Sequence, residues 1–193
     1  MKLNKDYWSS RYQQKNTGWD LGQVSPPIKA YIDQLTDNNI KILIPGGGNS
    51  YEAEYLFSQG FKNIFVIDLA LEPLNNLLFR EPNFPKEQLI QGDFFELEEQ
   101  FDLVLEQTFF CALPPTYRTD YATKMNNLLK TGGTLSGLIF DTEFEKQGPP
   151  YGGSKAEYIT YFNPYFKIKT IETCYNSIAP RQDKELFFIF KKN

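Results

Sequence analysis

The 193-residue chain contains no histidine. This absence excludes hydrolases that use a Ser-His-Asp or Cys-His arrangement, and it removes imidazole as a general base. It also removes the commonest protein ligand of zinc. We therefore expect a function that needs neither an imidazole nor a bound metal.

Cysteine is nearly as scarce, with Cys111 and Cys174 far apart in the sequence. Their spacing fits neither a CxxC motif nor a zinc finger, so we predict free thiols in a reducing compartment, with a single disulfide as the alternative. Cys111 follows two phenylalanines, which favours a buried core thiol over a nucleophile.

Long apolar runs and an excess of basic residues are also missing. No stretch approaches the roughly twenty apolar residues of a membrane span, and the polar N-terminus has no signal-peptide core. The net charge of −4 lacks the basic excess of nucleic-acid-binding proteins. We expect a cytoplasmic monomer or weak dimer with a small-molecule substrate and without a nucleic-acid or membrane partner.

Short apolar runs alternate with segments of helical spacing over most of the chain. The expected strands are residues 41–44, 63–68, 88–91, 101–105, 134–140, 166–174 and 185–190. Helices are expected from Pro26, over 51–59 ending near Gly60, over 72–79, and after Pro114-Pro115, while residues 130–133 are expected to form a turn. This alternation predicts an α/β fold: a mostly parallel sheet, helices on both faces and a C-terminal antiparallel hairpin. We expect a single domain over 1–193, with 1–39 as an N-terminal lead-in covering the cofactor site.

The first candidate ligand site is the turn from Pro45 through Gly46, Gly47 and Gly48 to Ser50. Glycines let the backbone approach a ligand, and the following helix offers free N–H groups. Tyr51 stands where a dinucleotide fingerprint has its third glycine, so a tight turn without a ligand is the alternative.

Two acidic residues follow the next two expected strands. Asp68 stands where nucleotide-binding α/β proteins hold ribose hydroxyls, although a solvated loop carboxylate is the alternative. Asp93, followed by Phe94 and Phe95, can accept from an exocyclic amine beside an aromatic ring, or can simply cap a helix. These elements suit an adenosine but do not separate S-adenosylmethionine from NAD.

Longer motifs distinguish S-adenosylmethionine from NAD, through a resemblance to known sequences. They are WSSRY at 8–12, TGWD at 17–20, IPGGG at 44–48, GDFF at 92–95, EQTFFCALPP at 106–115, Arg118 with Tyr121-Ala122, LLKTGG at 128–133 and GPPY at 148–151. Over nearly its whole length the chain resembles the thiopurine S-methyltransferase family, closest to its thiol and halide methyltransferase branch. The resemblance implies a Rossmann-like class I methyltransferase with S-adenosylmethionine as donor and S-adenosylhomocysteine as product.

The resemblance also implies a set of site residues. For the donor they are Trp8, Trp19, Pro45, Gly46, Gly47, Gly48, Asp68, Leu69, Asp93, Phe94, Phe95, Glu106, Gln107 and Thr108, and for the acceptor they are Arg118, Tyr151 and Arg181. The glycine turn then takes the methionine end, Asp68 the ribose, and Asp93 with Phe94 the adenine. For each arginine a surface ion pair is the alternative, and Tyr151 can instead pack over the Pro-Pro turn.

The chain departs from the family pattern in its turn and at Glu106. Gly47 replaces the usual cysteine, a further family glycine is replaced near Asn49-Ser50, and Glu106 stands where relatives often carry Asp. These departures leave donor binding in place and weaken any claim about the acceptor.

The expected reaction is methyl transfer to a small soft nucleophile: a thiol, a halide or a thiopurine. A thiol supplies some thiolate at neutral pH, so such an acceptor needs little help from a base, in agreement with a chain that lacks histidine. The alternatives are a methyltransferase for another small oxygen or nitrogen acceptor and a non-catalytic donor-binding module.

Overall fold

The computed structural model describes residues 3–146 and 148–193. The chain forms two compact units, Met1–Leu97 and Glu98–Asn193. Within the described ranges there are seven strands and six α-helices. None of the helices in these ranges is long and apolar enough to cross a membrane.

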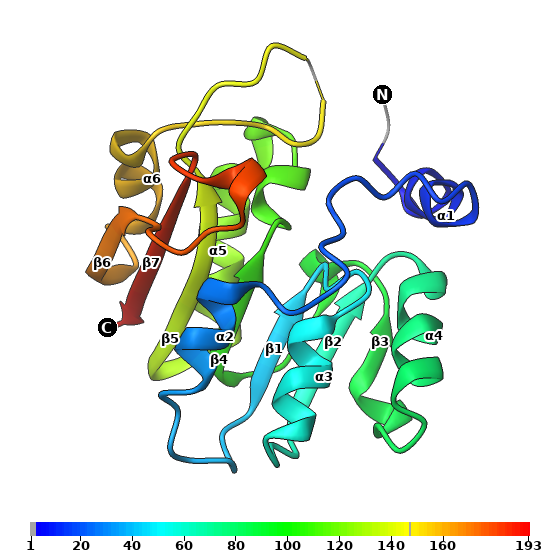
Figure 1. Cartoon of the computed structure of the whole chain (residues 1–193). Helices are drawn as coiled ribbons and strands as arrows, with labels where there is room; N and C mark the ends of the chain where they lie inside the picture. The colour runs from blue at the N-terminus through cyan, green and yellow to red at the C-terminus, as the bar shows by residue number, and fades with distance from the viewer. Residues whose placement is uncertain (1–2, 147) are drawn as a thin grey trace. The chain divides into compact units, whose positions relative to one another are not determined.

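The first unit is built around three parallel strands. β1 (Ile42–Pro45), β2 (Ile64–Asp68) and β3 (Leu89–Gln91) lie in the order β3-β2-β1. α3 (Tyr51–Ser58) and α4 (Leu71–Arg80) connect successive strands and pack on β2 (Figure 1). Because parallel strands end at one edge of a sheet, the segments that follow β1, β2 and β3 gather at that edge.

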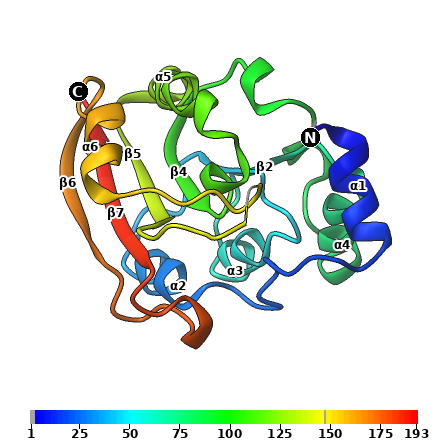
Figure 2. The same cartoon turned by 90° about the horizontal axis from the view of Figure 1, so that it is seen from above.

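Two helices precede this sheet. α1 (Lys5–Gln13) starts at Asn4, whose side chain accepts from the Tyr7 N–H, and it lies beside α4 (Figures 1 and 2). α2 (Pro26–Ile32) begins with two prolines, as expected from their preset φ, and packs on α3. The N-terminal lead-in is therefore tied to the first unit through two helix contacts.

The second unit contains four strands in the order β4-β5-β7-β6. They are β4 (Phe101–Gln107), β5 (Leu129–Phe140), β6 (Phe166–Thr173) and β7 (Glu185–Lys192). β4 and β5 are parallel, while β7 pairs antiparallel with both β5 and β6. The predicted antiparallel arrangement of the last two strands is confirmed.

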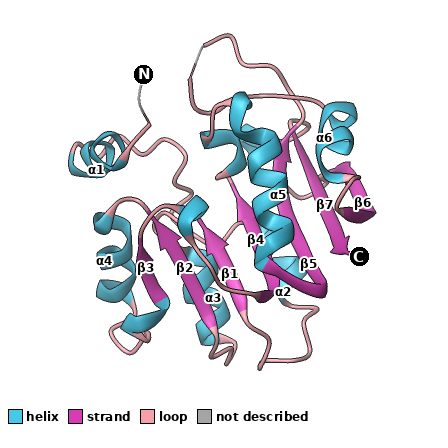
Figure 3. Cartoon of the chain, turned by 180° about the vertical axis from the view of Figure 1, so that it is seen from behind, coloured by secondary structure: helices cyan, strands magenta, loops and turns pink. Residues whose placement is uncertain are grey.

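α5 (Arg118–Leu128) and α6 (Lys155–Phe162) lie side by side on this second sheet (Figure 3). Tyr121, Met125 and Leu128 form the buried face of α5, and Leu129 already belongs to β5. Short 3-10 turns complete the chain: η1 (Lys86–Gln88), η2 (Phe94–Glu96), η3 (Phe110–Ala112), η4 (Pro115–Tyr117) and η5 (Ala179–Arg181).

The turn expected over residues 130–133 is wrong, because these residues belong to β5. The pairing of β5 with β4 jumps from Phe101↔Leu129 to Leu103↔Thr134, so extra residues bulge out of β5. Gly132 has φ +73°, which glycine adopts without steric cost. The local turn signal is real, but strand pairing on either side of it makes the turn a bulge.

β6 forms the outer edge of the second unit's sheet. Lys167 and Lys169 on this strand are exposed, whereas Phe166 and Ile171 are buried. Its pairing with β7 shifts between Ile168 and Thr170. The edge strand is therefore both charged and irregular.

Candidate active site

The glycine turn of the first unit follows β1 and leads into α3. Gly46 has φ +55° and Gly48 has φ +53°, both in the left-handed region that favours glycine. A Cβ on Gly47 would lie 2.6 Å from Val66 Cγ1 and 2.7 Å from Ser50 Oγ. The small residue that departs from the family pattern is therefore required by packing in this chain.

Asp68 ends β2 and is hydrogen-bonded to this turn. Its Oδ2 accepts from the Gly48 N–H at 3.0 Å, and its Oδ1 accepts from the Ala70 N–H at 2.9 Å. Burial raises the pKa of Asp68 to about 6. Each carboxylate oxygen keeps a further lone pair, so the group is fixed in place and still able to accept from a ligand's hydroxyls.

Aromatic rings stand next to the turn. Trp19 lies edge-on to Trp8 and to Tyr12, with ring centroids 5.4 and 5.8 Å apart. The Trp19 side chain hydrogen-bonds the Tyr12 hydroxyl, and that oxygen is 3.0 Å from where a Cβ on Gly48 would be. Burial, followed by the nearby Asp68, raises the pKa of Tyr12.

Sequence reasoning selected Trp8 and Trp19 but missed Tyr12. The missed signal is the spacing of Trp8 and Tyr12, which puts them four residues apart on one face of α1.

Asp93 follows β3 and caps η2. Its Oδ1 accepts from the Phe95 N–H at 2.9 Å, while Phe94 is buried. The Gly92 N–H donates to the Asp68 backbone oxygen at 3.0 Å, and Gln91 Nε2 donates to Leu69 O at 3.3 Å. The capping interpretation of Asp93 is confirmed, and its contact with adenine stays a prediction. These bonds join the ends of β2 and β3 within the first unit. They bring together Asp68, Leu69 and Asp93.

Glu106 lies near the end of β4 in the second unit and is only 1% exposed. One carboxylate oxygen accepts from the Phe109 N–H at 2.7 Å and the Phe110 N–H at 2.9 Å, and the other accepts from the Tyr121 hydroxyl. Burial raises the pKa of Glu106 to about 7. The longer carboxylate therefore fits, and it anchors the segment that follows β4.

Gln107 and Thr108 come directly after Glu106. Both polar atoms of the Gln107 carboxamide are buried and have no hydrogen-bond partner in the described part of the chain. Thr108 has φ +59°, a conformation that a β-branched residue adopts at a steric cost. An unsatisfied buried carboxamide beside a strained residue is typical of a ligand site.

Arg118 begins α5 and is 3% exposed. Its Nη1 is 2.5 Å from Glu157 Oε1, its Nη2 donates to Gly152 O, and its guanidinium lies over the Phe110 ring. The Tyr151 N–H, next in the chain to Gly152, donates to Cys111 O at 2.7 Å. Arg118 thus holds the segment that carries Tyr151, and direct contact of either side chain with an acceptor stays a prediction.

Arg181 forms a buried ion pair. Its Nη1 is 3.3 Å from Glu185 Oε1, and the other Glu185 oxygen accepts from Ser177 Oγ at 2.7 Å. Burial raises the pKa of Glu185. Arg181 therefore forms an ion pair that is buried and not on the surface, and its contact with an acceptor stays a prediction.

Both cysteines are buried and free, as predicted. Burial, followed by the charge of Glu106, raises the pKa of the Cys111 thiol, and its Sγ lies 3.3 Å from Thr108 O. A buried, protonated thiol supports the interpretation of Cys111 as a core residue.

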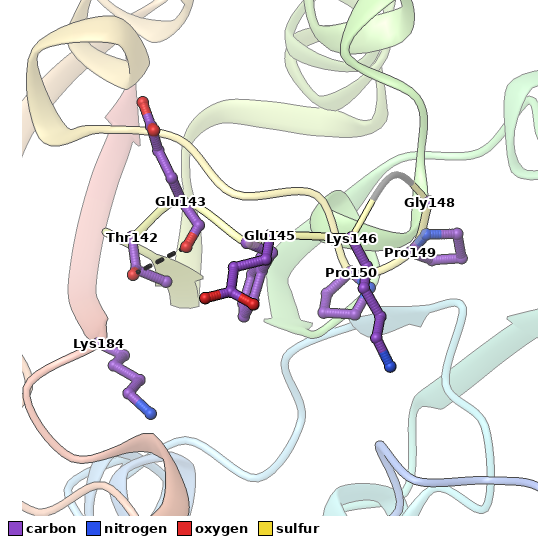
Figure 4. A pocket seen from close by; sticks show the side chains of 9 residues that line it. Thr142, Glu143, Glu145, Lys146, Gly148, Pro149, Pro150 and Lys184 are labelled. Carbon is purple, nitrogen blue, oxygen red and sulfur yellow. Dashed lines mark hydrogen bonds between the residues drawn. The ribbon is translucent and has the colours of Figure 1, made fainter.

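The second unit also has an open hollow of about 360 Å³, lined by the loop that connects β5 to α6 and by Lys184 and shown in Figure 4. Its lining residues are Thr142, Glu143, Phe144, Glu145, Lys146, Gly148, Pro149, Pro150 and Lys184. None of the predicted acceptor residues is among them, and both signs of charge are present. The hollow therefore does not by itself identify an acceptor.

Comparison with known proteins places this geometry in a family. The family model for thiopurine S-methyltransferase matches residues 3–191. A probable thiol methyltransferase 2 from Arabidopsis thaliana is 31% identical, over 96% of this chain and 84% of the relative. Thiocyanate methyltransferase 1 from Brassica oleracea is 30% identical over the same shares. The thiopurine S-methyltransferase of Nitrosomonas eutropha is 24% identical, over 93% of this chain and 90% of the relative.

Solved structures agree on the fold. The Burkholderia thailandensis 1,6-didemethyltoxoflavin-N1-methyltransferase with bound S-adenosylhomocysteine has a TM-score of 0.78 at 17% identity, covering 98% of this chain and 87% of that one. Magnesium protoporphyrin IX methyltransferase from Synechocystis, also with S-adenosylhomocysteine, has a TM-score of 0.77 at 12% identity, covering 98% and 97%. The predicted class I methyltransferase fold is confirmed, and S-adenosylmethionine, not NAD, is the cofactor. The chain belongs to the thiopurine S-methyltransferase family and is an S-adenosylmethionine-dependent methyltransferase.

Proposed function

We propose that this protein methylates a small soft nucleophile, with a thiol as the first choice and a thiocyanate-like or halide anion or a thiopurine as related acceptors. The observation that carries this proposal is the match over residues 3–191 together with relatives named for thiol and thiocyanate substrates. A thiol acceptor also suits a chain without histidine, because ionisation near pKa 8.5 already supplies thiolate.

We propose that the donor is held by the residues around the glycine turn. The two fixed oxygens of Asp68 suit the ribose hydroxyls, and Gly46–Gly48 let the backbone approach the methionine end. Asp93, Phe94, Phe95 and Leu69 are assigned to the adenosine side, and Trp8 and Trp19 to the aromatic cover beside the turn. When bound, this donor supplies a methyl group on a positively charged sulfur, which a nucleophile attacks directly.

Gln107 is proposed as a further donor contact, because its buried carboxamide has no hydrogen-bond partner in residues 3–146 and 148–193. Glu106 and Thr108 are assigned to the same contact region. The carboxylate of Glu106 fixes the two N–H groups that follow Thr108, so its role is to position Gln107 and Thr108.

On the acceptor side, we propose that the Tyr151 hydroxyl orients the acceptor. Arg118 and Arg181 are engaged by Glu157 and Glu185, so their supported role is to hold the acceptor-side segments. Methyl transfer is an in-line displacement, and the protein's main contributions are alignment of the acceptor and exclusion of water.

The test is isothermal titration with S-adenosylmethionine, S-adenosylhomocysteine and NAD, followed by a methyl-transfer screen. The screen uses hydrogen sulfide, small organic thiols, thiocyanate, iodide and a thiopurine, with oxygen and nitrogen acceptors as comparison. Turnover confined to the soft nucleophiles supports the proposal. Turnover only on oxygen or nitrogen acceptors favours the first alternative, and donor binding without any turnover favours a non-catalytic module.

We further propose a cytoplasmic monomer or weak dimer that acts as one methyltransferase domain and has no nucleic-acid partner. The free thiols support a reducing compartment, and the net charge of −4 argues against a phosphate-backbone partner. Light scattering coupled to size-exclusion chromatography tests the oligomeric state.

A further inference from the structure

Arg11 on α1 is a partly buried cation that forms no ion pair within residues 3–146 and 148–193. Its Nε atom is buried and has no hydrogen-bond partner in the described residues. No carboxylate in that part of the chain forms an ion pair with its guanidinium, whose recorded contacts are with aromatic rings. Burying a charge without a partner is unfavourable, so such a group points to a missing anion.

The guanidinium stands next to the glycine turn. Its Cζ lies 5.6 Å from the centre of the Trp19 ring and 5.9 Å from that of Tyr7. The Nε1 atom of the same Trp19 is 4.0 Å from where a Cβ on Gly48 would be. Trp19 therefore joins Arg11 to the turn that is assigned to the methionine end of the donor.

Three carboxylates lie near Tyr12, the neighbour of Arg11 in the chain: Asp20, Asp68 and Glu72. Asp68 accepts from the N–H groups of Gly48 and Ala70, and Asp20 accepts from the Gly22 N–H and the Asn49 amide. Glu72 accepts from Gln13 Nε2 at 2.7 Å and also interacts with Ser9 and Lys5. None of the three forms an ion pair with Arg11 within residues 3–146 and 148–193, so a ligand can supply the carboxylate that pairs with its guanidinium.

We propose that Arg11 binds the carboxylate of the methionine moiety of S-adenosylmethionine. This assignment rests on the donor site proposed above and adds a residue that the sequence motifs did not single out. A planar guanidinium matches a carboxylate with two parallel hydrogen bonds, and the cation–π contact with Trp19 helps to hold the guanidinium beside the turn.

The experiment measures the dissociation constants of two ligands by titration calorimetry. One is S-adenosylhomocysteine, and the other is its decarboxylated analogue, which keeps the adenosine, sulfur and amine. Arg11→Met keeps an apolar stem against Trp19 but removes the charge, and Lys5→Met, exposed on the same helix, is the matched charge control. Arg11→Met should weaken S-adenosylhomocysteine by about 10- to 100-fold, the range for a charge-assisted contact. The affinity of Arg11→Met for the decarboxylated analogue should change less than threefold. Lys5→Met should leave the affinities for both ligands unchanged.

Three results would overturn the assignment. Unchanged affinity of Arg11→Met for S-adenosylhomocysteine removes Arg11 from the contact. An equal loss for both ligands shows that Arg11 acts by packing on Trp19. A thermal melt of Arg11→Met shows whether this variant is simply unfolded. In that case Arg11→Lys, which keeps the positive charge and an aliphatic side chain, replaces it in the same titrations. If the unaltered protein binds neither ligand, the donor site itself is wrong, which separates that failure from a failure of Arg11 alone.

Discussion

Glu106 is a carboxylate buried with three donors: the N–H groups of Phe109 and Phe110 and the hydroxyl of Tyr121. Its pKa is raised to about 7 by burial, so the folded protein binds the Glu106 proton more tightly than the unfolded chain does. Between about pH 4.5 and 7 the folded state therefore holds more protons, and the stability that it draws from this group falls as the pH rises.

Glu106→Gln should remove this pH dependence. The amide oxygen can accept from both N–H groups, and the amide nitrogen can donate to the Tyr121 oxygen, so the geometry is retained. We expect the free energy of unfolding of the variant, relative to the unaltered protein, to rise from pH 5 to pH 8 by an amount on the order of 3 kcal/mol at most. Denaturant titrations at several pH values measure the difference, and a constant difference would contradict the assignment.

Asp68 should make donor binding depend on pH in the opposite direction. Only the ionised carboxylate accepts from two ribose hydroxyls, and burial places its pKa at about 6. We expect the affinity for S-adenosylhomocysteine to be constant above pH 7 and to fall by about tenfold at pH 5. Asp68→Ala should weaken binding by about 1–3 kcal/mol at pH 7.5 and abolish the fall. Calorimetry at both pH values tests this, and an equally steep fall in the variant would assign the titration to another group.

Individual site residues could be predicted from the sequence where the signal is local. Asp68 and the glycines were found because their signals are local: a strand end and a glycine run. The environment of Arg118 could not be predicted from the sequence, because its partners Gly152 and Glu157 stand 34 and 39 residues further along the chain. Arg11 and Tyr12 belong to a recognised motif, but nothing in the motif says that one lacks an anion and the other touches a glycine turn.

At the scale of elements, the turn between β1 and α3 depends on the neighbouring strand β2. Gly47→Ala should destabilise the protein by about 1–3 kcal/mol, because the new methyl overlaps Val66 Cγ1 and Ser50 Oγ. In a Val66→Ala background the same change should be less harmful, with a coupling energy above about 0.5 kcal/mol. Gly18→Ala is the control, since a Cβ at Gly18 meets nothing within 4 Å. Additive free energies in the double variant would contradict the packing argument.

Most elements were predictable from periodicity. β1, β2, α3 and α4 lie within two residues of the expected bounds, because apolar runs and breakers coincide there. α6 was not predicted, because its apolar residues do not form a clear stripe. Its start is set by Ser154, whose side chain accepts from the Glu157 N–H. The bulge of β5 was read as a turn because pairing with β4 and β7 is a long-range property.

At the scale of the whole molecule, the donor should stabilise the fold. A ligand that binds only the folded state at 100 times its dissociation constant adds about 2.7 kcal/mol, which raises the melting temperature of a chain of this size by roughly 5–10 °C. S-adenosylhomocysteine should produce this shift, and NAD at the same concentration should not. Thermal melts with each ligand test it, and an equal shift with NAD would contradict the choice of cofactor.

The edge strand β6 has a consequence for the behaviour of the protein in concentrated solution. An exposed strand edge is a template on which another chain can add its own strand. Lys167 and Lys169 place repelling charges there, and the register shift between Ile168 and Thr170 interrupts the straight ladder that such growth requires. The lysines of β6 thus serve colloidal solubility, and neutral β-branched residues in their place would favour fibrous aggregates without altering the methyltransferase site.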